Sequence, residues 1–333
     1  MNITWITFGP IHNTDNQGLF SPLASVRYRI IIPAMILSQH GYRVRLSPVP
    51  HKTTLEAIKP LLTSDVVIFS KSITDLNEQL AKQAQHAGAR IIFDICDNYL
   101  DDPRYGRHYN FMINLADQVV ANTQAMAERI EAHTGKQAEV IGEPVEGPQG
   151  QPQFAPTDPL RLLWFGHPVN FDSLQAMIPQ IFPLSQQRRL ALHIVTAPHE
   201  GIIQACHQFN QQHGNQFQLH FSPWSLKTTW QALHDTDMVV IPTVENHKKY
   251  VKSPNRLVEA LWGGRFVIAH PLPAYQEFAA WSWLNWDLCS GIQWAMQHPQ
   301  AVLSALEASQ SYIARHYSPA VIAQQWAHIL GTA

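Results

Sequence analysis

Short runs of apolar and β-branched residues alternate with longer amphipathic stretches along almost the whole chain. Such runs are typical of buried strands, and the stretches between them have helical spacing. Strand and helix in this alternation predict the α/β class, with parallel sheets covered by helices on both faces. The expected strands are residues 2–8, 43–46, 66–70, 90–95 and 118–121, and then 160–165, 191–196, 216–221, 238–242 and 266–269.

The alternation is interrupted once, by a stretch rich in proline and glycine that is typical of a linker. With 333 residues, 45% of them hydrophobic, the chain is long enough for about two domains with separate cores. We expect two Rossmann-like, doubly wound domains, residues 1–147 and 160–310, joined by a linker over residues 148–159. Their ligand would bind in a cleft at the carboxyl ends of the strands. Residues 311–333 would form a helical segment that crosses back to the first domain.

Charge and composition exclude several classes of protein. Lys plus Arg is 23 and Asp plus Glu is 25, so there is no basic excess for binding nucleic acid. No apolar run approaches the roughly 18 residues of a membrane span, and the start lacks the features of a signal peptide. The three cysteines form no C-x-x-C pair, and the 18 histidines form no H-E-x-x-H motif. We expect a cytoplasmic protein with no resident metal, and peripheral contact with the inner membrane face stays open.

A helix is expected over residues 26–40, because Gly41 is a typical residue after a helix end. Arg27 and Arg29 lie two positions apart on it and would diverge by about 200 degrees. Only one of them can face a cleft, and the other is expected to be solvated.

The loop and helix that follow the strand ending at Pro242 are the most informative part of the sequence. Ser253 is a preferred N-cap residue and Pro254 suits the first helical position, so a helix should begin here. Its first N–H groups have no intrahelical partner, and its dipole makes this end positive. Three lysines precede it in the loop. Together these features predict a site for phosphate or diphosphate.

A purely structural interpretation of the same residues is also open. Ser253 would then only cap the helix, the lysines would be solvated, and Glu259 would form a helical ion pair with Arg256. In the functional interpretation, Glu259 would accept hydrogen bonds from hydroxyl groups such as those of a ribose.

The stretch from Lys252 to Ala269, KSPNRLVEALWGGRFVIA, resembles the nucleotide-sugar signature of GT-B glycosyltransferases of the large retaining family 4. Residues 160–166 and 233–242 resemble the opening strand and a later strand of the donor domain in that family. Residues 93–97 and 116–123 resemble segments of its acceptor domain. The resemblance covers most of the chain and is strongest around the signature.

The resemblance implies a GT-B fold that transfers a sugar from a nucleoside diphosphate sugar, with retention of configuration. The carboxy-terminal half would hold the donor, and the amino-terminal half would hold a glycan, a lipid-linked molecule or a small molecule as acceptor. No cofactor is implied, because the nucleotide sugar is a co-substrate. Fixed cations and helix N–H groups can stabilise the departing diphosphate without a metal.

The candidate residues for the diphosphate lie around the start of the expected helix. Arg256, Lys252 and Lys248 would stabilise the leaving group, and Ser253 and Asn255 would position it.

Other candidates come from separate parts of the chain. Gly166 and His167, in the first turn of the second domain, are implied to offer backbone N–H groups to the donor phosphates. Asp97 is the candidate for contact with the transferred sugar or the acceptor. Members of the family often place a first glutamate eight positions before the second, where this chain has Val251, and Glu245 is the nearest upstream acid that could replace it.

This departure keeps two alternatives open. One is a non-catalytic nucleotide-sugar-binding or scaffold protein of the same fold, and the other is a sugar-nucleotide epimerase, which would need a paired acid and base. A metal site in the acidic run formed by Asp94, Asp97, Asp101 and Asp102 is disfavoured, because its spacing is D-x-x-D rather than D-x-D. Capping or solvent exposure is the expected role of those acids.

Overall fold

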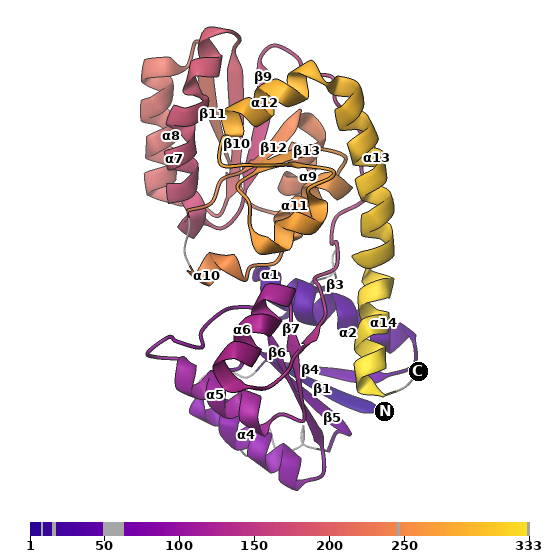
Figure 1. The fold of residues 1–333 in the computed structure, drawn as a ribbon. Coiled ribbons are helices and arrows are strands. Elements are labelled where there is room, and N and C mark those ends of the chain that lie inside the picture. Colours follow the sequence, from indigo (N-terminus) through magenta and orange to yellow (C-terminus); the bar gives the residue numbers. More distant parts are fainter. Residues whose placement is uncertain (8, 15–17, 49–62, 245–246, 332–333) are drawn as a thin grey trace. The chain divides into compact units, whose positions relative to one another are not determined.

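The computed structural model describes residues 1–7, 9–14, 18–48, 63–244 and 247–331. The chain divides into two compact units, each of which contains a six-stranded sheet (Figure 1). Both units are assembled from separate stretches of the chain. Unit 1 comprises Met1–Glu146, Tyr250–Ser253 and His316–Ala333, and unit 2 comprises Gly147–Lys249 and Pro254–Arg315.

The main sheet of unit 1 is parallel and has the order β4-β1-β5-β6-β7-β8. Its strands are β1 (Asn2–Thr7), β4 (Arg43–Pro48), β5 (Val66–Ser70), β6 (Arg90–Ile95), β7 (Gln118–Ala121) and β8 (Glu139–Val140). Among the described residues of unit 1, the α-helices are α1 (Ala24–Val26), α2 (Ile32–Gln39), α4 (Asp75–His86), α5 (Gly106–Leu115), α6 (Gln124–Thr134) and α14 (Pro319–Leu330). An antiparallel hairpin, β2 (His12–Thr14) and β3 (Gly18–Phe20), follows β1.

The two faces of this sheet carry separate hydrophobic cores, because side chains alternate along each strand. Ile6, Phe69 and Phe93 belong to the core formed with α4, α5 and α6. Trp5 belongs to the opposite core, formed with α2 and α14. There it meets Trp326 of α14 edge to face, with 4.8 Å between ring centroids. The last helix of the chain thus completes the core of the first unit.

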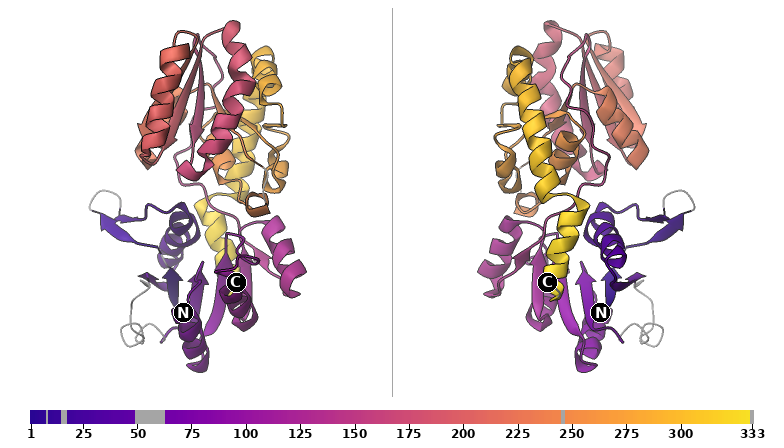
Figure 2. Two further views of the ribbon diagram at one scale, coloured as in Figure 1. Left: turned by 90° about the vertical axis from the view of Figure 1, so that its left-hand side faces the viewer. Right: turned by 90° about the vertical axis from the view of Figure 1, so that its right-hand side faces the viewer.

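Unit 2 has a parallel sheet with the order β11-β10-β9-β12-β13-β14. Helices lie on both sides of these strands (Figure 2). The strands are β9 (Leu160–Phe165), β10 (Leu190–Thr196), β11 (Phe217–Pro223), β12 (Met238–Ile241), β13 (Phe266–Ala269) and β14 (Trp283–Leu284). The α-helices are α7 (Phe171–Ile181), α8 (Glu200–His213), α9 (Leu226–Asp235), α10 (His247–Tyr250), α11 (Asn255–Trp262), α12 (Leu288–Gln297) and α13 (Pro299–His316). Short 3₁₀ turns are η3 (Pro168–Asn170), η4 (Phe182–Gln186) and η5 (Pro273–Phe278).

The proline- and glycine-rich run that was expected to be a linker over residues 148–159 lies within unit 2. It has no regular secondary structure, but the Gly150 N–H donates to the Trp262 carbonyl at the end of α11. A Cβ added at Gly150 would lie 2.2 Å from the Gly263 oxygen, and one at Gly264 would lie 2.1 Å from the Gln151 oxygen. These glycines are therefore required for close packing of two backbones.

The expected helix over residues 26–40 begins at Ala24 and contains a π-helical turn, η1 (Arg27–Ile31). Both of its arginines are buried, Arg27 in an ion pair with Glu146 and Arg29 in one with Asp94. The expectation that one of them would be solvated is wrong, because each guanidinium has its own carboxylate inside unit 1. Burial of a paired charge is tolerated where a lone one is not.

The C-terminal helical segment is broken near Ser318, whose hydroxyl accepts a hydrogen bond from Val321 N and caps α14. α13 belongs to unit 2 up to Arg315, and the remainder of the chain belongs to unit 1. None of the described helices combines the length and the apolar composition that crossing a membrane requires.

Truncation of Trp326 to alanine is expected to destabilise unit 1 by about 3–5 kcal/mol, because this fully buried ring packs on Trp5. Chemical unfolding followed by tryptophan fluorescence and by calorimetry measures the loss. Trp286→Ala is the matched control, since that ring is 44% exposed, and it should change the stability by less than about 1 kcal/mol. Equal losses in the two variants would contradict the assignment of α14 to the core of unit 1.

Candidate functional site

The carboxyl ends of β9, β12 and β13 are neighbours at one edge of the unit 2 sheet. Gly166 directly follows β9, and His270 directly follows β13. The segment between β12 and β13 contains α10 and α11. Because ligands of open parallel sheets bind beyond the carboxyl ends of the strands, this edge is the candidate site of unit 2.

Helix α11 begins at Asn255, with Pro254 at the N-cap position and no side-chain cap. The expected cap, Ser253, belongs to unit 1, and its hydroxyl donates to Glu143 Oε2 at 2.6 Å. The assignment of Ser253 as the cap of this helix is therefore wrong, because its hydroxyl forms a hydrogen bond with the buried carboxylate of Glu143 instead. The first-turn N–H groups of α11 keep the capacity to bind an anion.

Arg256, in the first turn of α11, lies against the loop that follows β9. Its Nη1 is 3.5 Å from the Phe165 carbonyl oxygen. Tyr275, in η5, lies near enough for the charge of Arg256 to influence its ionisation. Burial raises the pKa of Tyr275, and the charge of Arg256 opposes the rise. The Phe165 carbonyl and the Tyr275 phenol are neutral, so neither cancels the charge of the guanidinium.

Lys249 is a second cation of unit 2, and the sequence did not single it out from its neighbours. Its Nζ donates to Ser173 Oγ at 3.0 Å, in the first turn of α7. Ser173 Oγ also accepts a hydrogen bond from the Val244 N–H, at 3.1 Å. Burial lowers the pKa of Lys249 and the charge of Arg256 lowers it further, while the negative charge of Asp172 opposes the decrease. The two cations are therefore close enough to repel each other, as expected where an anion binds.

The loop after β9 differs from the expectation of N–H contacts to phosphate from Gly166 and His167. The Gly166 N–H donates to the Val195 carbonyl at 3.1 Å and continues the ladder between β9 and β10. The expected contact from Gly166 is therefore wrong. His167 is exposed, and its Nδ1 accepts a hydrogen bond from Val169 N at 3.2 Å.

Glu259 lies in the middle of α11 and is buried, with 6% of its surface exposed. Its Oε2 accepts a hydrogen bond from the Gly147 N–H at 3.2 Å. Glu245 and the side chain of Lys248 lie outside the described residues.

In unit 1, Asp97 follows β6 and is bridged by two lysines. Its Oδ2 pairs with Lys71 and its Oδ1 with Lys252. Burial alone would raise the pKa of Asp97, but the charges of the two lysines outweigh it and lower the pKa below the usual value. The structure thus brings two predicted residues, Asp97 and Lys252, together with Lys71, which no sequence pattern indicated. Lys71 has a φ of 51°, which is uncommon for a residue other than glycine.

Lys252 is part of a four-residue segment, Tyr250–Ser253, that belongs to unit 1. Val251 is 2% exposed and lies in the same core as α4, α5 and α6. Its carbonyl accepts a hydrogen bond from the Thr123 hydroxyl at 3.0 Å. The position where the family often has a glutamate is therefore a core position here, and only an apolar side chain suits it.

The chain has known structural neighbours at low sequence identity. No protein-family model matches the chain, and no curated protein matches it in sequence. HepE of Anabaena, solved in complex with UDP, aligns with a TM-score of 0.71 at 15% identity over 100% of both chains. A glycosyltransferase from Rickettsia africae aligns with a TM-score of 0.70 at 12% identity, over 100% of this chain and 99% of that one. The alpha-glucosyltransferase AGT, in complex with UDP, aligns with a TM-score of 0.67 at 10% identity over 99% of both chains.

The chain has the GT-B fold. Each of its two parallel six-stranded sheets corresponds to one Rossmann-like half of that fold. The similarity establishes the architecture, and the residues at the strand ends must carry any statement about chemistry.

The acidic run of unit 1 serves several separate contacts in this GT-B structure. Asp94 pairs with Arg29, and Asp101 pairs with Arg129. Asp102 accepts a hydrogen bond from the Arg104 N–H at 3.0 Å.

Elsewhere in unit 1, Asp75, Glu78 and His108 could bring three metal-ligand atoms together. Two of these side chains already form a hydrogen bond with each other, since His108 Nδ1 lies 2.6 Å from Glu78 Oε1. Asp75 is also engaged, in an ion pair with Arg107.

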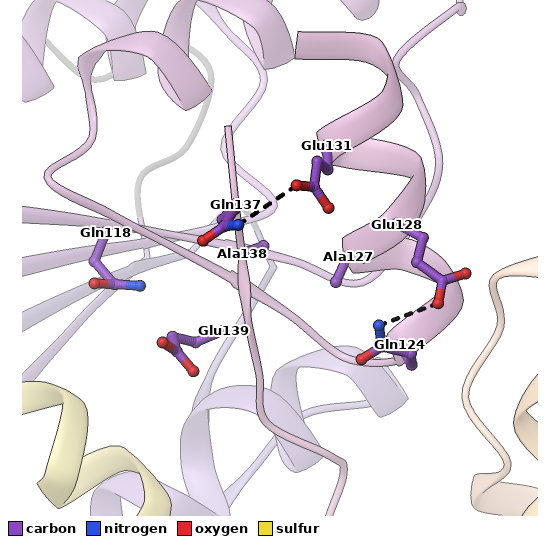
Figure 3. A pocket seen from close by; sticks show the side chains of 8 residues that line it. All are labelled: Gln118, Gln124, Ala127, Glu128, Glu131, Gln137, Ala138 and Glu139. Atoms are coloured by element: carbon purple, nitrogen blue, oxygen red, sulfur yellow. Dashed lines mark hydrogen bonds between the residues drawn. The ribbon is translucent and has the colours of Figure 1, made fainter. Parts of the chain in front are cut away.

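A polar pocket of about 380 Å³ also lies in unit 1, beside α6 and the edge strand β8 (Figure 3). It is lined by Gln118, Gln124, Ala127, Glu128, Glu131, Gln137, Ala138 and Glu139. Three carboxylates line it and no cation does, so this pocket is poorly suited to a diphosphate.

Asp97→Asn is expected to lower the stability of unit 1 by about 2–4 kcal/mol at pH 7, because two lysines lose their shared carboxylate. The folded pKa of Asp97 lies below the unfolded value of about 3.9, so this contribution is complete above that pH and is lost as the pH falls. Urea unfolding at pH 7 and pH 3.5 should show the gap between variant and wild type shrinking at the lower pH.

Asp75→Asn is the control for this prediction, since its pair with Arg107 has side chains that are 71% and 69% exposed. It should cost less than about 1 kcal/mol at either pH. A gap for Asp97→Asn that widens on acidification would show that the carboxylate is not held in its ionised form.

Proposed function

We propose that the chain is a glycosyltransferase whose donor, a nucleoside diphosphate sugar, binds to unit 2. The observation that carries this proposal is the approach of Arg256 and Lys249 at the carboxyl edge of a parallel sheet, beside the uncapped start of α11. Two cations and free helix N–H groups suit a diphosphate. HepE, of the same fold, has been solved with UDP and with UDP-glucose, so a uridine donor is the first to test.

The chemical task is to stabilise the diphosphate as its bond to the sugar breaks and its negative charge grows. Arg256 and Lys249 supply fixed positive charge there, and the first N–H groups of α11, beginning at Asn255, position the phosphates. A well-aimed donor of this kind is worth about 3 kcal/mol in the transition state. The leaving-group role expected for Lys252 passes to Lys249, since Lys252 is held by Asp97 in unit 1.

The remaining candidate residues take the roles that their surroundings allow. Glu259 binds the ribose hydroxyls from its place in the middle of α11. Asp97 belongs to the acceptor side, in unit 1, where Lys71 and Lys252 keep it ionised. His167 is an exposed loop residue that can contact the donor from the turn after β9.

Two finer parts of the proposal rest on the resemblance to family 4. The transfer would retain the anomeric configuration, and the protein's own cations would replace a divalent metal at the diphosphate. The acceptor would be a glycan, a lipid-linked molecule or a small molecule, and the protein would act in the cytoplasm or at the inner membrane face.

Arg256→Ala is expected to lower turnover of a UDP-sugar at least about tenfold, with a melting temperature within a degree or two of the wild type. Lys249→Met should act in the same direction. Lys227→Met, on α9, is the control for loss of a lysine in unit 2 and should leave turnover unchanged. Calorimetry with UDP and a donor-hydrolysis assay measure binding and turnover. A wild-type protein that binds UDP but turns over no donor with any acceptor would instead be a scaffold, which the apolar Val251 makes the second candidate.

Chelation is expected to leave the transferase activity intact, because fixed protein cations carry the charge of the leaving group. The measurement is donor turnover before and after treatment with EDTA and dialysis. Loss of activity that added Mg²⁺ or Mn²⁺ restores would reject the metal-independent part of the proposal.

A further inference from the structure

Ser173 lies in the first turn of α7, the helix that follows β9. It is buried, with 2% of its surface exposed. Its hydroxyl oxygen accepts two hydrogen bonds, one from Lys249 Nζ at 3.0 Å and one from the Val244 N–H at 3.1 Å. Both donors belong to the segment between β12 and β13, so a single hydroxyl joins this segment to the start of α7.

The position of the Lys249 ammonium is unfavourable for its charge. The first turn of a helix is the positive end of the helix dipole, which favours carboxylates over lysines. Burial and the charge of Arg256 also disfavour the charged form of Lys249, and together they outweigh the opposing charge of Asp172, an exposed acid of the same helical turn. A cation that is held in such surroundings is typical of a site that binds an anion.

A serine hydroxyl can hold an ammonium without neutralising it. It offers two acceptor positions, and here Lys249 and the Val244 N–H occupy them. The next residue of α7, Leu174, is fully buried, so the helical turn that carries Ser173 is fixed in the interior of unit 2. A long, flexible lysine side chain is thus held by a rigid part of the fold. A carboxylate in place of the hydroxyl would also hold Lys249 but would weaken its attraction for a phosphate.

We propose that Ser173 is a positioning residue that holds the Lys249 ammonium where the donor diphosphate binds, a role that rests on the proposed function of unit 2. Ser173 acts on the nucleotide only through Lys249. Its bond to the Val244 N–H fixes the end of the loop after β12 to the same oxygen. Without the hydroxyl, the dipole of α7 and the charge of Arg256 would drive the ammonium away from this place.

The test is a double-mutant cycle on UDP binding, measured by calorimetry. Ser173→Ala should weaken UDP binding about tenfold, the size expected when a hydrogen bond to a charged group is lost. Ser173→Thr, which keeps the hydroxyl, should restore most of this loss. In a Lys249→Met background, Ser173→Ala should have no further effect. Ser185→Ala is the matched control, because it removes another buried hydroxyl of unit 2, which donates to the Phe182 carbonyl at 2.7 Å, and it should leave UDP binding unchanged.

A second measurement does not require nucleotide. The ¹⁵N-edited NMR signal of the Lys249 ammonium, assigned by its absence in Lys249→Met, should be visible in the wild type, because a hydrogen-bonded ammonium exchanges its protons slowly with water. In Ser173→Ala the signal should broaden or vanish, and in Ser185→Ala it should be unchanged.

The outcomes separate this inference from the proposed function. If the wild type binds no UDP, the proposed function fails, and the NMR comparison still decides whether Ser173 holds Lys249. If UDP binds and Ser173→Ala weakens it equally with and without the Lys249 side chain, the positioning role is rejected. The same conclusion follows if Ser173→Ala leaves UDP binding unchanged, whatever happens to the ammonium signal.

Discussion

Parallel strands bring their carboxyl ends to one edge of a sheet, and every candidate donor-binding group of this chain depends on that constraint. β9, β12 and β13 are neighbours in unit 2, although they are far apart in the sequence. The turn after β9 therefore meets the first turn of α11, and Lys249 reaches the first turn of α7. Mutual repulsion between two cations is unfavourable, and a bound anion would relieve it.

Much of the fold could be predicted from the sequence because its signals are local. Apolar runs such as residues 66–70 and 90–95 coincide with β5 and β6. The hairpin β2–β3 and the two-residue strands at the sheet edges were missed, because such short segments carry almost no periodic pattern.

The contacts of the candidate site were less predictable, because its residues depend on partners far away in the sequence. Ser253 is a residue type that often caps helices, yet its hydroxyl forms a hydrogen bond with a glutamate 110 positions earlier. Gly166 matches a glycine turn, yet the space beside it is filled by an arginine 90 positions later. Local propensity identified these residues as special, and tertiary contacts decided what they do.

The discontinuous make-up of unit 1 limits how this chain can be divided. A cut after Glu146 would leave the amino-terminal fragment without Val251 in one core and without Trp326 in the other. Each sheet face would then present an uncovered apolar surface, which favours aggregation over independent folding. Exchange of unit 2 with the corresponding half of another GT-B protein would have to include the segments that return to unit 1, or those segments would have to fit the core of the new protein. The two halves of the chain would therefore have to evolve together, even though each six-stranded sheet contains strands of its own unit alone.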